Sequence, residues 1–286
     1  MSTVTPPARP AGPATPAGSP GRAGSPAGAP AAARSNSELV RAKIGLLMPG
    51  FSALTSRLWT SPAVAELYPR YLRLLHTAIR ATVPLMDLAL ERSEALAPTD
   101  PVAAGLVGYL TRHRREERGH DDWVREDLAA IGHDPDTLLS AMPGTAVANL
   151  VGAQYYWIRH HHPVCLLGHI AVLEGYPPSP ALTGYLRERT GYPAEGFRTL
   201  HRHATLDVRH RDELLRVLDD LPLAAEHHTA IGVSALHTLQ TTTVLFEELL
   251  ATAPTEATAP TEVVAATVTE PGNAPVASPG PAARPV

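Results

Sequence analysis

The chain has 286 residues, 44% of them hydrophobic and 18% charged, which is enough for one sizeable hydrophobic core or two small ones. Its net charge of −4 gives no electrostatic basis for binding nucleic acid or an anionic membrane surface. The single cysteine, Cys165, excludes an internal disulfide and is typical of a protein in the reducing cytoplasm.

Both ends of the chain are poor in large apolar residues. Residues 1–35 consist mostly of Pro, Ala, Gly, Ser and Thr, and residues 251–286 begin with the tandem repeat ATAPTEATAPTE. Such segments bury too little apolar surface to offset chain entropy, so both are predicted to be disordered tails around one folded domain at 36–250. The N-terminal segment has no continuous apolar stretch, which argues against a secretory signal. The longest uncharged stretch, 137–158, is interrupted by proline, glycine and polar residues, which argues against a membrane span.

Helical periodicity with well-marked breaks dominates the predicted domain. Strand signals are weak, because no sustained alternation of apolar and polar residues is bounded by turn residues. Helices are expected at 36–48, 61–97, 99–132, 134–142, 144–178, 179–191, 194–222 and 224–251. Pro84 is expected to kink the second of these segments, and Pro163 to interrupt the fifth. The predicted fold class is therefore all-α, a bundle of about seven helices.

The segment 194–222 carries polar residues where a helix should turn apolar ones to the core. Steps of three and four residues give a face of Phe197, Leu200, His203, Asp207, His210, Leu214, Val217 or Leu218, and Leu221. The ends of this face are apolar, and its middle is His-x3-Asp-x2-His. Since an unpaired polar or charged group in a core costs roughly several kcal/mol, these three residues predict a bound partner.

The segment 99–132 repeats this pattern. Its inward face is Leu106, Leu110, His113, Glu117, His120, Val124, Leu128 and Ile131. Glu117 and His120 form the Glu-x2-His motif that carboxylate-bridged dinuclear proteins project into bundle cores. A third polar position is Glu174, which ends an almost charge-free segment and shares a face with Tyr156, Leu167 and Ile170.

These positions supply three carboxylates and three histidines but no thiolate, a set of donors that suits Fe or Mn. Six protein ligands are too many for one catalytic ion with open coordination positions. They suit two ions with three protein ligands each and room for O2 or a substrate. Zinc is disfavoured, because the sequence has no His-Glu-x2-His and structural zinc sites rarely use three carboxylates.

Neighbouring residues leave alternatives open. Glu116 competes with Glu117 as a ligand, but Glu117 lies better on the inward face. His113 is expected to hydrogen bond to a ligating carboxylate, with direct metal binding as the alternative. In the sequence RHHHP at 159–163, His160 is expected on the same helical face as Glu174, while His161 and His162 are expected at the surface.

A non-metal explanation exists for each motif. A single buried histidine is more often a hydrogen-bonded core residue than a ligand. His203, Asp207 and His210 could also form a polar cluster on a solvated face, although the apolar residues in register on both sides argue against this. The joint occurrence of three such elements favours the metal interpretation.

Three segments, HRREERGHDDWVREDLAAIG, PVCLLGHIAVLEGYPPS and HRHATLDVRHRDELL, resemble the haem-oxygenase-like di-iron oxidases and oxygenases, also called iron-containing redox enzymes. The likeness covers most of 60–250, and its specific part is the ordered set Glu-x2-His, Glu and His-x3-Asp-x2-His. It implies a seven-helix bundle resembling haem oxygenase, two Fe(II) ions per chain instead of haem, and O2 as co-substrate. The implied ligands are Glu117, His120, Glu174, His203, Asp207 and His210.

The resemblance also implies a class of reaction. Members of this family carry out N-oxygenation, oxidative C–C cleavage or decarboxylation of small amino-acid- or fatty-acid-derived metabolites. The expected partner is thus a small-molecule substrate, with a homodimer and an external reductant left open. One alternative is a cofactorless oxidase or thiaminase-like enzyme of the same fold, which leaves the in-register carboxylates unexplained. Another is a non-catalytic iron-binding helical protein.

Overall fold

The computed structural model describes residues 34–254, and this part of the chain contains twelve α-helical segments, one 3-10 turn and no strand. The predicted all-α fold class is therefore confirmed. The predicted tails, 1–35 and 251–286, lie outside the described residues except for their inner ends, 34–35 and 251–254. No helix within 34–254 is both long and apolar enough to cross a bilayer.

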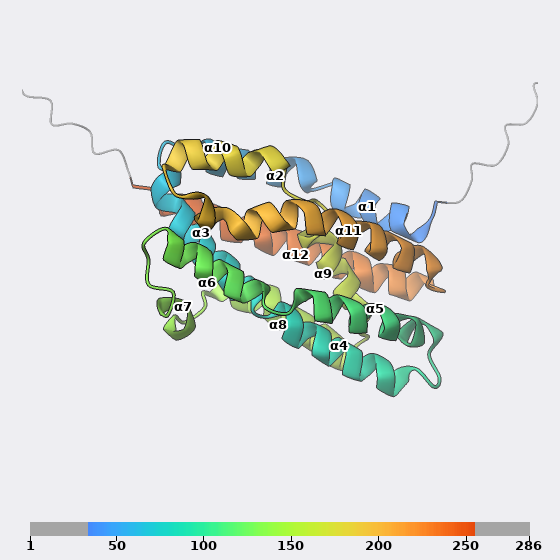
Figure 1. The fold of residues 1–286 in the computed structure, drawn as a ribbon. Coiled ribbons are helices and arrows are strands. Elements are labelled where there is room, and N and C mark those ends of the chain that lie inside the picture. The colour runs from blue at the N-terminus through green and yellow to red at the C-terminus, as the bar shows by residue number, and fades with distance from the viewer. Residues whose placement is uncertain (1–33, 255–286) are drawn as a thin grey trace, which may run out of the picture. The chain divides into compact units, whose positions relative to one another are not determined.

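The helices follow one another with short connections (Figure 1). In chain order they are α1 (Asn36–Gly45), α2 (Met48–Thr60), α3 (Val64–Ile79), α4 (Thr82–Leu96), α5 (Pro101–Glu117), α6 (His120–Ala130), α7 (Thr137–Ser140), α8 (Thr145–His160), α9 (Cys165–Leu173), α10 (Pro180–Thr190), the 3-10 turn η1 (Ala194–Phe197), α11 (Arg198–Asp220) and α12 (Ala225–Ala251). The longest, α12, packs against α9, α8, α1 and α2, while α4 packs on α5 and α3 on α6.

The helices of the described region outnumber the predicted seven, because long expected segments are broken. Within the segment 61–97, α3 ends at Ile79 and α4 begins at Thr82. Pro84 therefore lies in the first turn of α4, where proline is tolerated. The segment 144–178 is interrupted around Pro163, as predicted. Helix α2 was not expected, since Pro49 and Gly50 resemble a break. In the structure this proline lies in the first turn of α2 and is compatible with helix initiation.

A further break separates α5 from α6, within the segment expected as one helix at 99–132. Arg118 has extended backbone angles, and Gly119 has a φ of 83°. A residue with a Cβ pays roughly 1–2 kcal/mol in this left-handed region, so Gly119 is what permits the bend. Consequently Glu117 is the last residue of α5 and His120 is the first residue of α6.

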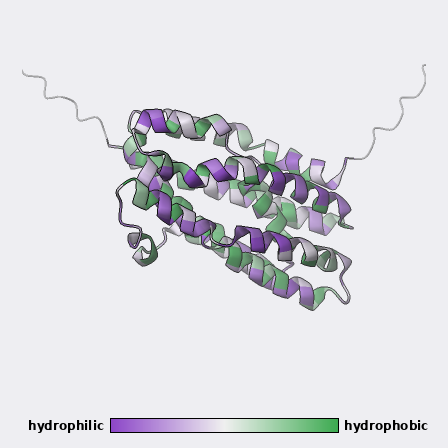
Figure 2. Ribbon diagram, viewed as in Figure 1, coloured by the Kyte–Doolittle hydropathy of each residue, from purple (hydrophilic) through white to green (hydrophobic). Residues whose placement is uncertain are grey.

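The apolar core forms two main clusters on either side of a polar middle. The first joins α1, α4, α9 and α12 with the early part of α5 and the late part of α11. The second joins α2, α3 and α10 with α6 and the early part of α11. Figure 2 shows hydrophilic residues along much of α11, α5 and α6. The inward faces predicted for 99–132 and 194–222 thus have buried apolar ends, and their polar middles lie between the two clusters.

Helix α9 approaches α12 closely at Gly168. A Cβ at this position would lie 2.2 Å from the carbonyl oxygen of Ile231 and 2.8 Å from the amide nitrogen of Ala235. Because backbone atoms would have to move, Gly168→Ala is expected to lower the free energy of unfolding by about 1–3 kcal/mol. Chemical denaturation of the metal-free protein measures this change. The control is Gly152→Ala in α8, where a Cβ meets nothing within 4 Å. Equal stability of the two variants would contradict the close packing.

Candidate metal centre

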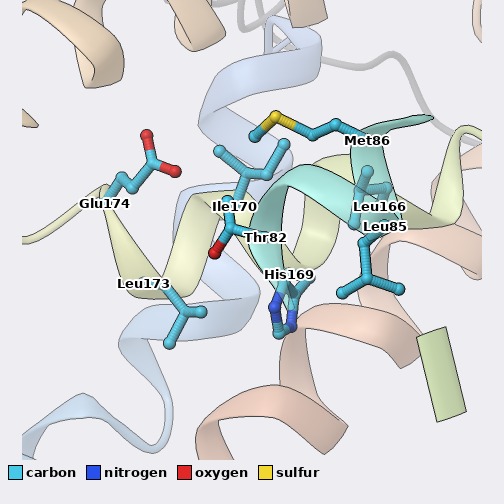
Figure 3. A pocket seen from close by; sticks show the side chains of 8 residues that line it. All are labelled: Thr82, Leu85, Met86, Leu166, His169, Ile170, Leu173 and Glu174. Carbon is cyan, nitrogen blue, oxygen red and sulfur yellow. The ribbon is translucent and has the colours of Figure 1, made fainter. Parts of the chain in front are cut away.

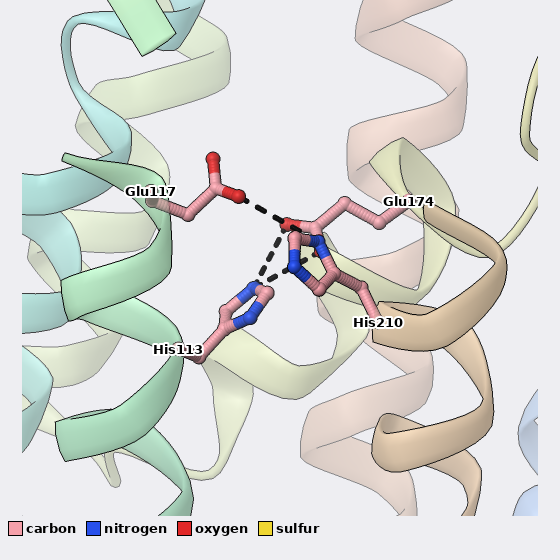
Figure 4. Close-up of side chains that lie close together, drawn as sticks. All are labelled: His113, Glu117, Glu174 and His210. Atoms are coloured by element: carbon pink, nitrogen blue, oxygen red, sulfur yellow. Dashed lines mark hydrogen bonds and ion pairs between the residues drawn. The ribbon is translucent and has the colours of Figure 1, made fainter. Parts of the chain in front are cut away.

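Four buried side chains from α5, α9 and α11 converge in the polar middle (Figure 4). They are His113, Glu117, Glu174 and His210. Each can offer one ligand atom such that these atoms all lie within 4.8 Å of one another. Glu174 caps the C-terminal end of α9, with Oε1 3.1 Å from Nε2 of His113 and Oε2 3.2 Å from Nδ1 of His210. This spacing is compact enough for the donors to surround one cation.

A second group shares Glu117 with the first. It consists of Glu117, His120 and His203, again with one ligand atom each within 4.8 Å. Oε2 of Glu117 lies 3.1 Å from Nδ1 of His120, whereas Oε1 lies 3.6 Å from Nδ1 of His210. The two oxygens of one carboxylate therefore face different groups, which is the arrangement of a carboxylate that bridges two metal ions.

One of the histidines is oriented by a hydrogen bond through its second ring nitrogen. Nδ1 of His203 donates to the carbonyl oxygen of Thr199 at 2.8 Å, which leaves Nε2 as the acceptor nitrogen. Histidines that bind metals are usually held in this way, by a carbonyl or carboxylate on the opposite nitrogen. Nε2 of His210 lies 3.3 Å from Oε2 of Glu116, an ion-pair distance without a hydrogen bond, while its Nδ1 faces Glu117 and Glu174.

Several buried polar atoms of this cluster make no hydrogen bond of acceptable geometry within the described region. They are Glu116 Oε2, Glu117 Oε1, Glu174 Oε2, Asp207 Oδ1, Nδ1 of His113 and of His120, and both ring nitrogens of His210. A buried polar atom left without a partner costs about 1–3 kcal/mol, more when it is charged. Carboxylate oxygens and imidazole nitrogens without thiolates suit iron. The residues present therefore fit the metal that the sequence resemblance implies.

The charges of the cluster are strongly coupled. Burial raises the pKa of Asp207 to about 8, and the nearby negative charge of Glu174 acts in the same direction. Burial would also raise the pKa of Glu174, but the adjacent His113 and His210 hold it well below its usual range. Conversely, Glu174 raises the pKa values of His113 and His210 against the effect of burial. In the metal-free protein, protons on Asp207, His113 and His210 thus offset the buried carboxylates, and a bound cation would take over this role.

Five of the six predicted ligands fall in the two groups: Glu117, His120, Glu174, His203 and His210. The sixth, Asp207, is buried on the same face of α11 but belongs to neither group, so its role as a ligand stays a prediction. His113 makes the contact with Glu174 that was expected of it, and it also offers a donor atom to the first group. Glu116 is less buried than Glu117 and reaches His210 from the far side of the ring.

The RHHHP segment differs from expectation. His160 ends α8 in an exposed position, contacts Tyr156 at a ring distance of 4.8 Å and belongs to neither group. Tyr156 is itself 64% exposed, so it does not share the buried face of Glu174. His162, expected at the surface, is buried, with Nε2 3.0 Å from Oδ2 of Asp100. The reason is that the helix ends before Pro163, so helical geometry no longer sets where this ring points.

Asp127 supports the site and was not found from the sequence. It is fully buried on α6, where its two carboxylate oxygens accept the backbone N–H groups of Arg198 and Thr199 at 3.1 and 2.9 Å. These are the first amides of α11, so Asp127 caps this helix from a different element. The carbonyl of Thr199 in turn holds His203. The sequence pattern around Asp127 does not indicate this role, because the amides that it caps lie 71 and 72 residues further along the chain.

The bend at Gly119 allows a direct prediction. Gly119→Ala is expected to lower the free energy of unfolding by about 1–2 kcal/mol, because alanine is disfavoured at a φ of 83° although a Cβ would meet no neighbour within 4 Å. The same change is expected to weaken metal binding, since the bend sets His120 against Glu117. Gly108→Ala, in the regular part of α5 and also without neighbours, is the control and should stabilise the helix slightly. Thermal denaturation compares the two, and an equal response of both variants would contradict the role of the bend.

A small cavity lies beside Glu174, between α4 and α9 (Figure 3). Its wall is mostly aliphatic, with polar groups from Thr82, His169 and Glu174. Burial lowers the pKa of His169 to about 4, so this ring is neutral at pH 7. The space open to the centre of a water-sized molecule is about 20 Å³, which is enough for one such molecule and not for an organic metabolite.

Residues 103–243 match the model of a family described as iron-containing redox enzymes. The matched region includes all the donors of both groups. No protein of curated function matches the sequence.

Solved structures share the fold at low sequence identity. A domain of unknown function with a haem-oxygenase-like fold from Shewanella denitrificans has a TM-score of 0.62 and 18% identity, over 74% of this chain and 89% of that one. A TenA homolog from Pseudomonas syringae pv. tomato has a TM-score of 0.58 and 12% identity, over 76% and 95%. A CADD-like protein of unknown function from Nostoc punctiforme has a TM-score of 0.58 and 15% identity, over 77% and 99%. Residues 103–243 therefore belong to the iron-containing redox enzymes, and the described part of the chain has a haem-oxygenase-like fold.

Proposed function

We propose that this chain is a non-haem oxidoreductase that binds two Fe(II) ions and uses O2 to oxidise a small amino-acid- or fatty-acid-derived metabolite. The observation that carries the proposal is the position of Glu117, which turns one oxygen to each of two groups of buried nitrogen and oxygen donors. The family described as iron-containing redox enzymes supports iron over manganese.

Each side chain has a role in this proposal. Ferrous ions bound here would supply electrons for the reduction of O2. Glu117 would hold the two ions next to each other, and His113 keeps the carboxylate of Glu174 in place. The carbonyl of Thr199 fixes the ring of His203 through its second nitrogen, and the carboxylate of Glu116 lies 3.3 Å from the second nitrogen of His210.

The surroundings of the donors matter as well. The two apolar clusters on either side exclude water, which strengthens the attraction between the carboxylates and a cation. The cavity beside Glu174 matches O2 in size and leaves the organic substrate to enter elsewhere.

Anaerobic iron loading tests the proposal. The protein is purified without oxygen, loaded with Fe(II), freed of excess metal, analysed for iron and then mixed with O2 in the presence of a panel of amino acids and fatty acids. About two ions per chain and substrate-dependent O2 consumption are expected. The double variant His203→Ala/Asp207→Ala should lose both, whereas His160→Ala, at an exposed position, should lose neither. Full activity of the double variant would contradict the proposal.

The same experiment separates the alternatives. A cofactorless oxidase or thiaminase-like enzyme of this fold would keep its activity after treatment with an iron chelator. A non-catalytic iron-binding protein would hold iron without consuming O2 beyond its own oxidation. The gathering of six donors in two groups around Glu117 argues against the first alternative, because general acid–base catalysis needs only one or two such residues.

A further inference from the structure

A groove at the surface lies between α6 and α11. It is lined by Trp123, His201, Arg202, Thr205 and Leu206. Its volume of about 420 Å³ falls within the range of small-molecule sites, whereas the cavity beside Glu174 is far too small for an organic molecule. Of these two hollows, the groove, which is open to solvent, is the one with room for a metabolite.

The groove contains a cation that is held in place but not neutralised. The guanidinium carbon of Arg202 lies 4.3 Å from the centroid of the Trp123 ring, a cation–π contact that restricts the side chain. Three other arginines of α11 each form an ion pair with a carboxylate. Arg202 forms no ion pair within residues 34–254, although its charge acts through space on the buried carboxylate of Asp127. Its planar set of N–H donors is thus open to an anion from solvent.

One wall of the groove touches the metal centre. The ring of Trp123 stacks on that of His120 at a centroid distance of 3.9 Å and an angle of 28°. It also meets His203 edge-on at 6.1 Å. A molecule held against Trp123 is therefore one ring away from two of the residues that can hold metal.

We propose that this groove binds an organic carboxylate, with the carboxylate on Arg202 and the apolar part of the molecule along Trp123 and Leu206. Guanidinium binds carboxylate through two parallel hydrogen bonds, while indole and leucine side chains favour an apolar body. The further step, that this carboxylate is the substrate, rests on the proposed function. Binding of a carboxylate to the groove requires no iron.

The test uses the metal-free, full-length protein with 15N-labelled tryptophan side chains. Its three indole signals come from Trp59, Trp123 and Trp157, and Trp123→Phe assigns the relevant one. The probes are octanoate, 3-phenylpropanoate and the primary amide of each. The acids are expected to shift the Trp123 signal in a saturable manner, and the amides to bind at least about tenfold more weakly.

Variants test whether Arg202 supplies the positive charge that binds the acids. Arg202→Gln is expected to weaken binding of the acids by about tenfold or more, and Arg202→Lys to retain part of the affinity because it keeps the charge. The control is Arg216→Gln on the same helix, whose side chain contacts the carbonyl oxygen of Asp212 and does not line the groove. Circular dichroism confirms that each variant is folded.

Several results would overturn the inference. They are equal affinity for acids and amides, undiminished binding by Arg202→Gln, shifts confined to Trp59 or Trp157, or no saturable binding of either acid. Iron uptake is measured on the same proteins. If Arg202→Gln takes up two ions but loses the acids, the inference and the proposed function both stand. If the acids bind but the wild type takes up no iron, the proposed function alone fails.

Discussion

Glu117→Ala is expected to reduce iron binding from about two ions per chain to fewer than one. Glu117 serves both donor groups, so its removal weakens both sites at once. Loss of a residue that merely supports a ligand lowers metal affinity by roughly 10–100-fold, and loss of a shared ligand should exceed that. The measurement is iron content after anaerobic loading and desalting.

The neighbouring residue provides the control. Glu116→Ala removes a carboxylate of the same type one position earlier, but within residues 34–254 that carboxylate pairs with Nε2 of His210 and the side chain of Arg209 and belongs to neither donor group. This variant should keep both ions with reduced affinity at the first group. If Glu116→Ala lost as much iron as Glu117→Ala, or if Glu117→Ala kept two ions, the inference that Glu117 serves both donor groups would be wrong.

The metal-free protein is expected to become less stable as the pH rises from about 7 to about 8. The pKa of Asp207 is raised by burial to about 8 in the folded protein, so the folded state binds more protons than the unfolded state in this range. Its stabilising contribution is therefore greatest below the unfolded pKa and is lost as the pH approaches 8. The raised pKa values of His113 and His210 act in the same direction. Histidines whose pKa is lowered by burial, His169 and His203 among them, act in the opposite direction, chiefly below about pH 6.5, so the loss of stability is expected only above about pH 7.

Asp207→Asn tests the origin of this dependence. The amide preserves the shape of the carboxyl group but does not ionise, so the variant should be less sensitive to pH and more stable than the wild type at pH 8 by about 1–3 kcal/mol. Urea denaturation at several pH values gives the comparison. Asp212→Asn, at an exposed position of the same helix, should leave the dependence unchanged. If the unfolding free energy of Asp207→Asn depended on pH as that of the wild type does, groups other than Asp207 would cause the dependence.

Bound iron should reverse the trend. Metal ions compete with protons for carboxylates and imidazoles, so the loaded protein is expected to gain stability as the pH rises over the same range. If stability changes with pH in opposite directions in the metal-free and iron-loaded proteins, the metal-free site is held together partly by protons. Parallel slopes would place the titrating groups outside the metal centre.

Periodicity was sufficient to locate most of the candidate site. His203, Asp207 and His210 share a face because α11 runs without interruption, and apolar residues on both sides of them fix which face points inward. The face of Glu117 and His120 was also predicted correctly, although the helix bends between them. The bend involves Arg118 and Gly119, which lie off that face, so the buried pattern survives it.

Features that depend on distant contacts could not be predicted. Asp127 caps a helix that begins 71 residues later, and His162 is buried because it pairs with Asp100. The stack of Trp123 on His120 likewise arises from the geometry of α6 after the bend. Such interactions do not change the periodicity of apolar residues in the sequence, because each joins two single residues and not two helical faces.

Diffraction from anaerobically iron-loaded crystals at the iron absorption edge tests the central claim most directly. Two anomalous peaks per chain are expected, one near Oε1 of Glu117 with His210 and Glu174, and one near Oε2 with His120 and His203. A single peak, or peaks that do not flank Glu117, would contradict that claim.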